Sequence, residues 1–496
     1  MARDDEEIEL KFVVAPGLWL DLQKQFGLVD STPPQTLVSR YFDTPAFALR
    51  RAGYTLRVRE EGGRWVQTVK SCGLGDGATR RQWNSPVADK NPDIRLITCD
   101  AAREALAGEA PTSLFTVDVK RRSVMVTKPR FTLEASFDDG RIDSSDYAIP
   151  FSDLVFQELE LELKTGDRRA YFAFVRALRD ACALRLSFLS KADRGFARLG
   201  DAAAGPAFAP CITSDSTVGA TFKATATAAL KQVCRQAQAL EPDSNAETVH
   251  QLRAAARRLR GLISTFKPMI DGPRAASIKA TLKRLTDDLG PARNIDVFRA
   301  GALRHIGWKK SPAGSQADFD RRLKDVRTTA YRRAVDAAHD DRFGAFALDA
   351  LIWIESGPWT TSKAAGATER DRSVAGFAAS ALDRAYRRVE KRARRFARLN
   401  RDERHALRIA VKTLRCGVEA FAGVFSTGPG RHRRFVAAIK TLLDDLGELN
   451  DLADGGPFDD ECQARLKAWR KKREARLLAS AAEAMRRLKS APQFWR

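Results

Sequence analysis

The stretch "EEIELKF", residues 6–12, alternates charged and apolar side chains. Successive side chains of a β-strand point to opposite faces, so this alternation predicts a strand with one apolar and one charged face. Taken alone, the charged face of such a strand is typical of a surface that contacts water. The apolar set is Ile8, Leu10 and Phe12, and the charged set is Glu7, Glu9 and Lys11.

The same period-2 pattern recurs through the first 200 residues. Turn-like "EGG", "GDG", "DDG" and "TGD" separate the segments, as expected for antiparallel strands, and helical patterns lie around 16–27 and 167–182. The first part of the chain is therefore predicted to be an antiparallel sheet with helices. The further strand-like segments are "TLRVRE" (55–60), "RWVQTVK" (64–70), "SVMVTK" (123–128), "RFTLEASF" (130–137) and "VFQELELEL" (155–163).

Length and composition indicate a folded chain of more than one domain. The chain has 496 residues, of which 44% are hydrophobic and 30% charged. Its longest apolar runs, such as "AFALDALIWI" (345–354), are too short to cross a bilayer. The acidic N-terminus lacks a secretory signal pattern, and the 7 cysteines are scattered without a C-x-x-C pair. We therefore expect a cytoplasmic protein without a membrane partner or a disulfide framework.

Charge divides the chain into two unlike parts. Residues 1–200 carry 30 Lys and Arg against 29 Asp and Glu, whereas residues 201–496 carry 55 against 34. The small, Pro- and Gly-containing stretch 201–218 between them has the composition of a linker. The basic part is expected to have an anionic partner, with nucleic acid, polyphosphate and an acidic membrane surface as the candidates.

The second part has helical periodicity throughout and contains an internal repeat. "VHQLRAAARRLRGLISTF" (249–266) matches "RHALRIAVKTLRCGVEAF" (404–421), and "LKRLTDDLGPARNID" (282–296) matches "IKTLLDDLGELNDLA" (439–453). Helix breaks are expected at "FKP", "LGP", "SGP", "STGPG" and "DGGP". The sequence predicts an all-α domain over 219–496, formed by two repeats at about 219–345 and 370–496.

Each repeat contains a stripe of basic side chains with helical spacing. Residues at offsets of 3, 7 and 10 lie on one narrow face of a helix. Like charges on one helix face repel, so a duplicated stripe favours a ligand with many negative charges, such as repeated phosphates. A solvated basic face, nucleic-acid binding and metal binding by the two histidines are the alternatives. The stripes are His250, Arg253, Arg257 and Arg260, and His405, Arg408, Lys412 and Arg415; Lys283 and Lys440 add matching bases from a second helix.

These residues resemble the CHAD domain, a duplicated helical bundle with an H-x-x-R-x-x-x-R/K-x-x-R pattern and an L-G-x-x-x-D-type turn. The resemblance covers roughly 215–496 and implies binding of long-chain inorganic polyphosphate by the basic residues of both repeats. Asn294 stands where the first repeat usually carries Asp, and Thr413 where a base is common. Both departures affect single contacts of the expected site.

If the sheet of residues 1–200 closes into a barrel, its charged residues are expected to line the interior instead of contacting bulk water. Alternate residues then point inside, where carboxylates and bases are unfavourable unless a ligand and cations complete the site. Carboxylates suit hard divalent cations such as Mg²⁺ or Mn²⁺, and bases suit a short chain of phosphates. Arg57 and Arg59 share one strand face, as do Glu158, Glu160 and Glu162.

This arrangement resembles the CYTH family of triphosphate tunnel enzymes. The signature E-x-E-x-K is residues 7–11, followed in order by "RYFDT" (40–44), "LRVRE" (56–60), "TVK" (68–70), "FQELELEL" (156–163) and "LSKADRG" (189–195). The resemblance spans about residues 5–200. It implies an α+β multidomain chain whose N-terminal domain, 1–200, is an eight-stranded antiparallel tunnel barrel with metal-dependent activity on triphosphates.

The CYTH resemblance also implies roles for individual residues. Gln82 stands where an acidic residue is common, and Asp43 in "FDTP" fits a turn cap as well as a metal contact. Lys191 is expected to close one tunnel end near the leaving phosphate, and Glu7, Glu9, Lys11 and Lys191 form the expected catalytic set. The expected metal ligands are Glu7, Glu9, Glu134, Glu158 and Glu160, and the expected phosphate contacts are Lys11, Arg57, Arg59, Lys70, Arg80, Arg121 and Lys191.

Together the two resemblances imply an inorganic triphosphatase that hydrolyses tripolyphosphate and also binds polyphosphate, with association with polyphosphate granules as a further expectation. Other substrates stay open at this point: thiamine triphosphate, a nucleoside triphosphate, or ATP for cyclisation. A polyphosphate-binding scaffold without turnover is the non-enzymatic alternative. Nucleic-acid binding by the helical half is a weaker option.

Overall fold

A computed structural model describes most of the chain and divides it into two compact units. The first unit comprises Met1–Cys211 together with Gly344–Ser356, and the second comprises Ile212–Phe343 and Gly357–Arg496. The described residues are 8–14, 16–28, 33–71, 82–143, 153–182, 184–199, 212–301, 313–361, 363–425, 429–453 and 460–496.

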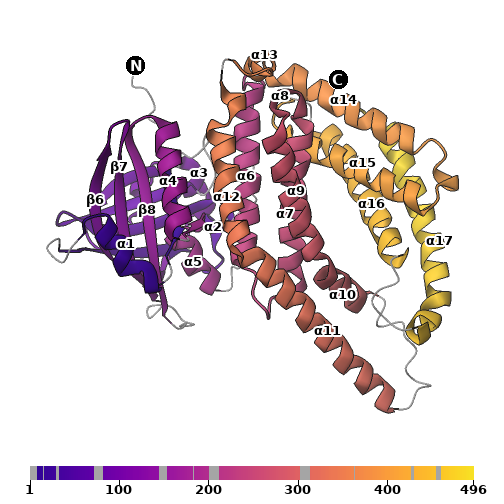
Figure 1. Ribbon diagram of the computed structural model, residues 1–496, viewed down its shortest axis with the longest axis horizontal. Helices are drawn as coiled ribbons and strands as arrows, with labels where there is room; N and C mark the ends of the chain where they lie inside the picture. Colours follow the sequence, from indigo (N-terminus) through magenta and orange to yellow (C-terminus); the bar gives the residue numbers. More distant parts are fainter. Residues whose placement is uncertain are drawn as a thin grey trace. The chain divides into compact units, whose positions relative to one another are not determined.

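The first unit is built on one antiparallel sheet, as the alternating segments predict (Figure 1). Its strands follow the order β5-β4-β3-β2-β6-β7-β8-β1-β9. The described sheet has nine strands instead of the expected eight, and the pairings of the described residues do not join β5 to β9. Closure of the tunnel therefore stays a prediction. The strands are β1 (Ile8–Val13), β2 (Gln35–Asp43), β3 (Tyr54–Glu61), β4 (Arg64–Ser71), β5 (Gln82–Val87), β6 (Thr112–Lys128), β7 (Phe131–Asp143), β8 (Leu154–Gly166) and β9 (Arg185–Ser187).

Turn chemistry explains one of the hairpins. Strands β3 and β4 meet at Glu61 and Arg64, leaving Gly62 and Gly63 as a two-residue turn. Both glycines have positive φ, 59° and 78°, which the tight turns of hairpins require. The "EGG" turn is therefore confirmed. The "DDG" turn (138–140) is wrong, because these residues lie inside β7 and pair with β8.

Helices cover the apolar face of the sheet around β7 and β8 (Figure 1). Trp19 and Phe26 lie against Phe137 with ring centroids 5.4 Å apart, and the Tyr171 hydroxyl donates to the Leu161 carbonyl at 2.9 Å. The other face of the sheet carries the charged residues and also a buried apolar cluster that includes Phe115, Phe156 and Phe196. The helices of the first unit are α1 (Trp19–Gln25), α2 (Ala48–Arg51), α3 (Asp100–Leu106), α4 (Arg168–Cys182), α5 (Lys191–Arg198) and α12 (Asp341–Ser356).

Residues Gly344–Ser356, most of helix α12, belong to the first unit, although the sequence-based division placed them in the helical domain 219–496. The helix pairs with α4 through Asp349, whose Oδ1 lies 2.8 Å from Arg176 Nη2, and through Glu355, 3.7 Å from Arg168 Nη1. Apolar residues of α12 such as Leu351 and Ile354 are buried.

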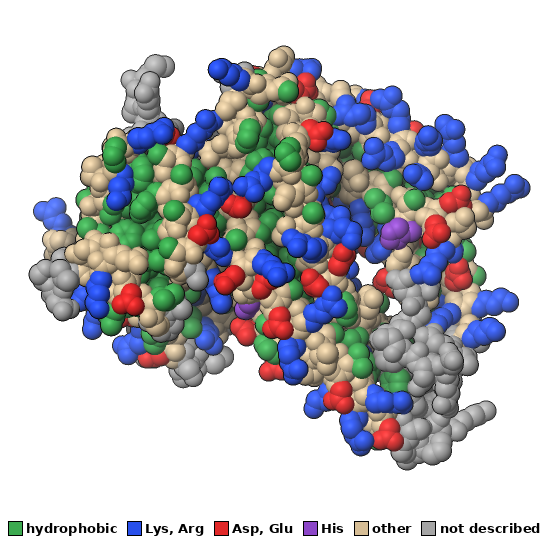
Figure 2. Space-filling model, viewed as in Figure 1, with side chains coloured by type: hydrophobic (Ala, Val, Ile, Leu, Met, Phe, Trp, Pro, Cys, Tyr) green, Lys and Arg blue, Asp and Glu red, His purple; other side chains and the backbone are tan. Residues whose placement is uncertain are grey.

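The second unit is entirely helical among its described residues, apart from an isolated bridge between Thr217 and Ser373. This arrangement confirms the predicted fold class. Figure 2 shows Lys and Arg side chains spread over the visible surface of these helices. No described helix is both long and apolar enough to span a membrane. The helices are α6 (Val218–Gln238), α7 (Ala246–Thr265), α8 (Lys267–Ile270), α9 (Pro273–Asp288), α10 (Gly290–Ala300), α11 (Ala313–His339), α13 (Ala367–Asp371), α14 (Val374–Arg392), α15 (Arg401–Ala420), α16 (Pro429–Ala453) and α17 (Asp460–Ser490).

The second shared segment has a different helical structure in the two repeats. In the second repeat "LLDDLGELND" runs through the single helix α16, whereas in the first repeat "LTDDLGPARN" is divided between α9 and α10. Pro291 lies in the first turn of α10. Proline has no N–H to donate and clashes with the preceding turn, which explains the interruption.

Candidate active site

Strand register places the charged residues of the first unit on one face of the sheet. Directly opposed residues in an antiparallel pair point to the same side. Lys11 is opposite Glu160, which is opposite Ser136 on β7. Further along, Arg121 on β6 is opposite Asp138, and Asp138 is opposite Glu158. Four neighbouring strands therefore contribute to one charged surface.

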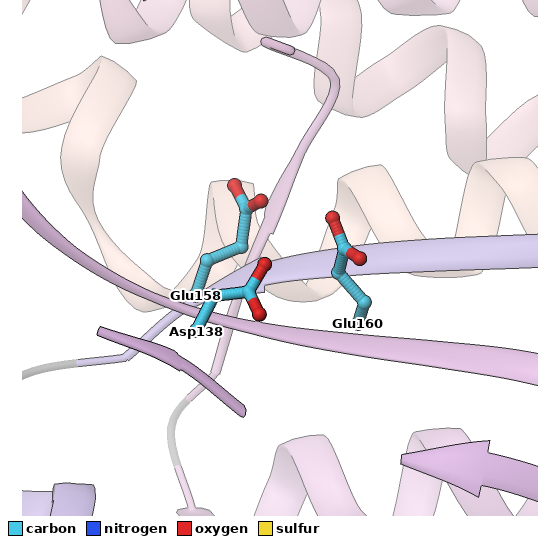
Figure 3. Close-up of side chains that lie close together, drawn as sticks. All are labelled: Asp138, Glu158 and Glu160. Atoms are coloured by element: carbon cyan, nitrogen blue, oxygen red, sulfur yellow. The ribbon is translucent and has the colours of Figure 1, made fainter. Parts of the chain in front are cut away.

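Three carboxylates from β7 and β8 converge on this face. Asp138, Glu158 and Glu160 point toward one another (Figure 3), and one oxygen from each lies within 4.8 Å of the others. Asp138 and Glu158 are fully buried, and Glu160 is 6% exposed. Buried carboxylates at this spacing repel unless cations compensate for them. Hard oxygen ligands in this arrangement fit a divalent cation such as Mg²⁺ or Mn²⁺.

Lys191 lies at the centre of the three carboxylates. Its Nζ is 2.7 Å from Asp138 and 2.9 Å from both Glu158 and Glu160. Burial would lower the pKa of Lys191, but the three carboxylates outweigh burial and raise the pKa well above its ordinary value. The side chain is therefore a firmly protonated ammonium.

Three further cations surround the cluster. Arg121 binds both oxygens of Asp138 at 2.7 Å and also contacts Glu160 at 2.5 Å. Lys11 pairs with Glu160 and, at 3.0 Å, with Glu9, while Arg194 pairs with Glu158. These bidentate and charge-assisted contacts fix the orientation of the carboxylates.

The cations also determine the ionisation of the cluster. Burial alone would raise the pKa of Glu160, but Lys11, Lys191 and Arg121 outweigh it and hold the pKa well below its ordinary value. Burial would likewise lower the pKa of Lys11, yet Glu160 and Glu9 raise it. At neutral pH Glu160 is therefore a carboxylate and Lys11 an ammonium group.

The remaining predicted bases lie farther across the same face. Arg57 is opposite Thr68 on β4, and Lys70 is opposite Thr55, so Arg57, Arg59 and Lys70 share one side. Arg59 donates to Glu61 at 2.8 Å. Arg57 Nε is buried without an acceptor among the described residues, and burial lowers its pKa. A phosphate oxygen is the kind of acceptor that this donor lacks.

Glu134 belongs to the same face but not to the three-carboxylate cluster. It is opposite Glu162, which is opposite Glu9, so three acids lie in a row across β7, β8 and β1. Lys164 Nζ is 2.9 Å from Glu134 and 2.7 Å from Glu162. Glu7 and Arg80, two other predicted site residues, lie outside the described part of the chain.

In the second unit, the two basic stripes lie on α7 and α15. Leu252, Leu259 and Leu262 on a neighbouring face of α7 are buried, as is Phe266 directly after the helix. Burial and the charges of Arg253, Arg408 and Arg293 lower the pKa of Arg257 to about 10. Burial and Arg408, Arg257 and Arg253 lower the pKa of Lys412 to about 7. Bases from both repeats are therefore close enough to repel one another.

Not every residue of the stripes is part of this repelling group. Lys283 pairs with Asp287 at 2.6 Å, and Arg415 pairs with Glu419 at 2.7 Å. His405 and Asn450 are hydrogen-bonded at 2.9 Å. Burial and Arg293 lower the pKa of His250, which favours a neutral imidazole. The remaining predicted positions differ in exposure, with Arg260 half-buried and Lys440 exposed on α16.

Comparison with known families identifies both units. Residues 5–196 match the CYTH domain and residues 224–454 match the CHAD domain. The chain carries a CYTH domain followed by a CHAD domain. It is also 28% identical over 196 residues to an inorganic triphosphatase of Haemophilus influenzae, a match that covers 38% of this chain. The chain spans about half, 54%, of the length of that relative.

The chain is also similar to two solved structures. The CHAD domain of the plant Ricinus communis is 24% identical, with a TM-score of 0.47, and the match covers 58% of this chain and 97% of that one. PptA of Streptomyces chartreusis is 19% identical, with a TM-score of 0.39, and the match covers 56% of this chain and 99% of that one.

Sequence reasoning missed Asp138 and Arg194 in the CYTH domain and Arg293 in the CHAD domain. Asp138 was hidden in "DDG", although Glu134, Ser136 and Asp138 alternate along β7 as the other site residues do. Arg194 follows Lys191 by three residues on α5, on the same helix face. Both signals were present in the sequence.

Asp43 of the CYTH domain caps a helix. Its carboxylate accepts backbone N–H groups from Thr44 at 2.7 Å, Leu49 at 2.9 Å and Arg50 at 2.8 Å. Burial raises its pKa, and these three donors oppose the rise. The turn-cap interpretation of "FDTP" is confirmed, since these contacts account for both carboxylate oxygens.

Proposed function

We propose that the CYTH domain hydrolyses a triphosphate, with tripolyphosphate as the preferred substrate, and that the CHAD domain binds long-chain polyphosphate. The observation that carries the first proposal is the cluster Asp138–Glu158–Glu160, surrounded by bases on one sheet face. An anionic substrate and a cation are the two partners that such a surface lacks. The similarity to an inorganic triphosphatase supports the same choice of substrate.

The carboxylates of the site would bind the cation, and the bases would bind the phosphate chain. Asp138, Glu158 and Glu160 would hold Mg²⁺ or Mn²⁺, which when bound supplies charge neutralisation at the phosphate oxygens. Arg57, Arg59 and Lys70 would bind the phosphate chain, and the unpaired Nε of Arg57 would donate to one of its oxygens. Lys11 and Arg121 contact Glu160 of the metal-binding set and would also bind the phosphate chain.

Hydrolysis on this surface requires an in-line attack by water on a terminal phosphorus. A P–O bond forms from the water oxygen, the anhydride P–O bond breaks, and diphosphate and phosphate result. The proton of the water is released to solvent or to product. Glu9, whose side chain is 33% exposed, is an accessible carboxylate that can orient the water. Lys191 would stabilise the charge that develops on the leaving diphosphate.

A substrate panel tests the reaction. Phosphate release is measured from tripolyphosphate, ATP and thiamine triphosphate with Mg²⁺ or Mn²⁺, and cyclic nucleotide formation is measured in parallel. We expect the highest kcat/KM for tripolyphosphate and loss of turnover on chelation. A higher kcat/KM for another triphosphate, or cyclic product from ATP, would replace the proposed substrate. Metal-independent background with all three substrates would favour a binding scaffold.

Polyphosphate binding by the CHAD domain is supported by the mutual repulsion of Arg253, Arg257, Arg408 and Lys412. A polyanion would relieve this repulsion. We expect Arg257→Ala to weaken binding of long polyphosphate by about tenfold or more, as is typical for a lost charge-assisted contact. Arg321→Ala on α11, which removes a base paired with Asp318, is the matched control. Competition with RNA and DNA at fixed salt tests the nucleic-acid alternative.

A further inference from the structure

Helix α5, which carries Lys191, begins with a reciprocal cap. The Ser190 hydroxyl oxygen accepts the Asp193 N–H at 3.1 Å, and the Ser190 N–H donates to Asp193 Oδ2 at 2.9 Å. The Ser190 hydroxyl also donates to Oδ2 at 2.8 Å. This capping box fixes the first turn of the helix and uses one oxygen of Asp193.

The other oxygen of Asp193 binds Arg50 from helix α2. Arg50 Nη2 lies 2.8 Å from Asp193 Oδ1, and the two side chains are only 3% and 7% exposed. The Arg50 guanidinium carbon also lies 4.9 Å from the ring centroid of Phe196. Arg50 therefore contacts α5 at two points one turn apart, near the start of the helix and farther along it.

The backbone of Arg50 is itself held in place by Asp43. Helix α2 is a single turn, Ala48–Arg51, too short to be stable without tertiary support. The buried Asp43 carboxylate accepts the Leu49 and Arg50 N–H groups and so holds this turn in place. A continuous set of contacts thus leads from Asp43 through Arg50 and Asp193 to α5.

We propose that Arg50 is a positioning residue, which acts through Asp193 and α5 to hold Lys191 and Arg194 against the carboxylate cluster. Both cations project from the first turns of α5, so a shift or rotation of the helix changes their distances to Glu158 and Asp138 together. The effect on hydrolysis rests on the proposed function, whereas the effect on Lys191 does not. Misplacement by about 1 Å can slow a reaction by roughly 10²-fold.

Chemical labelling tests the positioning without any turnover. An amine-reactive reagent is applied to the full chain, and modification of the Lys191 peptide is measured by mass spectrometry. Three carboxylates hold the Lys191 ammonium in the unmodified protein, so its reactivity should be low. Arg50→Met should raise the labelling rate of Lys191 severalfold. Arg51→Met, which alters an exposed neighbour on α2, should leave that rate unchanged.

A second variant distinguishes a displaced Lys191 from an unfolded domain. Removal of Arg50 takes a cationic partner away from the buried Asp193 carboxylate, which can destabilise the domain. Asp193→Asn keeps the shape of the side chain and its acceptor oxygen while removing the ion pair, and the same rise in Lys191 labelling is expected. Unchanged labelling in a variant whose circular dichroism shows a folded chain would overturn the proposal.

Kinetics then test whether Arg50 acts through Lys191. With tripolyphosphate, Arg50→Met is expected to lower kcat more than it changes KM, and Arg50→Lys to recover part of kcat. In a Lys191→Met background the Arg50→Met change should have a smaller further effect on kcat, because one of the two groups it positions is gone. Independent, multiplicative losses would contradict the proposal. If the unmodified protein has no triphosphatase activity, the proposed function fails while the labelling result still decides the role of Arg50.

Discussion

The ammonium group of Lys191 contacts one oxygen from each of the three carboxylates that could hold a cation. An ammonium and a divalent ion cannot occupy that space together, so the two compete. Lys191→Met should therefore tighten Mn²⁺ binding in the absence of substrate, by about tenfold or more if one compensating charge is lost. Titration calorimetry measures this, with Lys90→Met at an exposed position as the control. Weaker Mn²⁺ binding in Lys191→Met would contradict the assignment.

A second residue-scale expectation concerns pH and Lys412. Its pKa of about 7, below the ordinary value, means that the folded chain holds this charge only at lower pH. A bound polyanion would stabilise the ammonium, raise the pKa and cause proton uptake. Polyphosphate affinity should therefore fall as pH rises from about 6 to 9. Lys412→Arg, which stays charged, should flatten this dependence when binding is measured at constant ionic strength.

The stability of the chain without a ligand is expected to have the opposite pH dependence. Because folding lowers the pKa of Lys412, the folded state carries an unfavourable charge below pH 7 that it loses as pH rises toward the ordinary value. Without a ligand, Lys412 should therefore destabilise the chain at acidic pH and become neutral in its effect at alkaline pH. Lys412→Met should raise the midpoint of thermal unfolding more at pH 6 than at pH 9. Equal shifts at both values would contradict this account.

At the scale of elements, the close packing of α5 against β6 leaves no space for a side chain at Gly195. A Cβ atom there would meet the Phe115 ring at 2.3 Å, too close for any side chain. Gly195→Ala should therefore destabilise the domain by about 1–3 kcal/mol, as overpacking typically does, and displace α5. Denaturant unfolding measures the change. Gly376→Ala on α14, where the nearest atom is 3.8 Å away, should instead be neutral or stabilising.

Some elements were predictable from the sequence and others were not. The alternation of Glu9 and Lys11 with apolar residues predicts β1, because a strand with one buried face has an apolar residue at every second position. The same rule assigns Asp138 to β7, but its neighbours "DG" are also favoured in turns, and this turn propensity conceals the alternation. The joining of Asp138 to Glu158 depends on strand register, which a single strand does not reveal. Similarly, the Arg50–Asp193 pair joins residues far apart in the sequence.

At the scale of the whole molecule, α12 makes the first unit discontinuous. A fragment of residues 1–211 lacks Asp349 and Glu355, which pair with α4, and the apolar side chains of α12. Each buried Leu or Ile side chain contributes about 1.5–3 kcal/mol, so the fragment should unfold at a lower temperature and bind an apolar dye. Thermal unfolding and dye fluorescence check this.

A tethered helix provides the matched control for that fragment. Residues 341–356 joined to 1–211 through a Gly/Ser linker should restore part of the unfolding temperature. The same fusion with Asp349→Arg and Glu355→Arg places like charges against Arg176 and Arg168 and should restore less. Identical behaviour of all three fragments would mean that α12 contributes nothing to the first unit.

The discontinuity also sets an order of events during synthesis. Residues 212–343, which include α6 to α11, leave the ribosome before Gly344–Ser356 does. At about 5–20 residues per second, the nascent first unit therefore waits several seconds or more for its last helix. During that interval the apolar surface that α12 will cover is open to chaperones and to neighbouring chains. Slowing translation within 212–343 should lengthen this exposure and reduce the yield of folded protein, although the amino-acid sequence is unchanged.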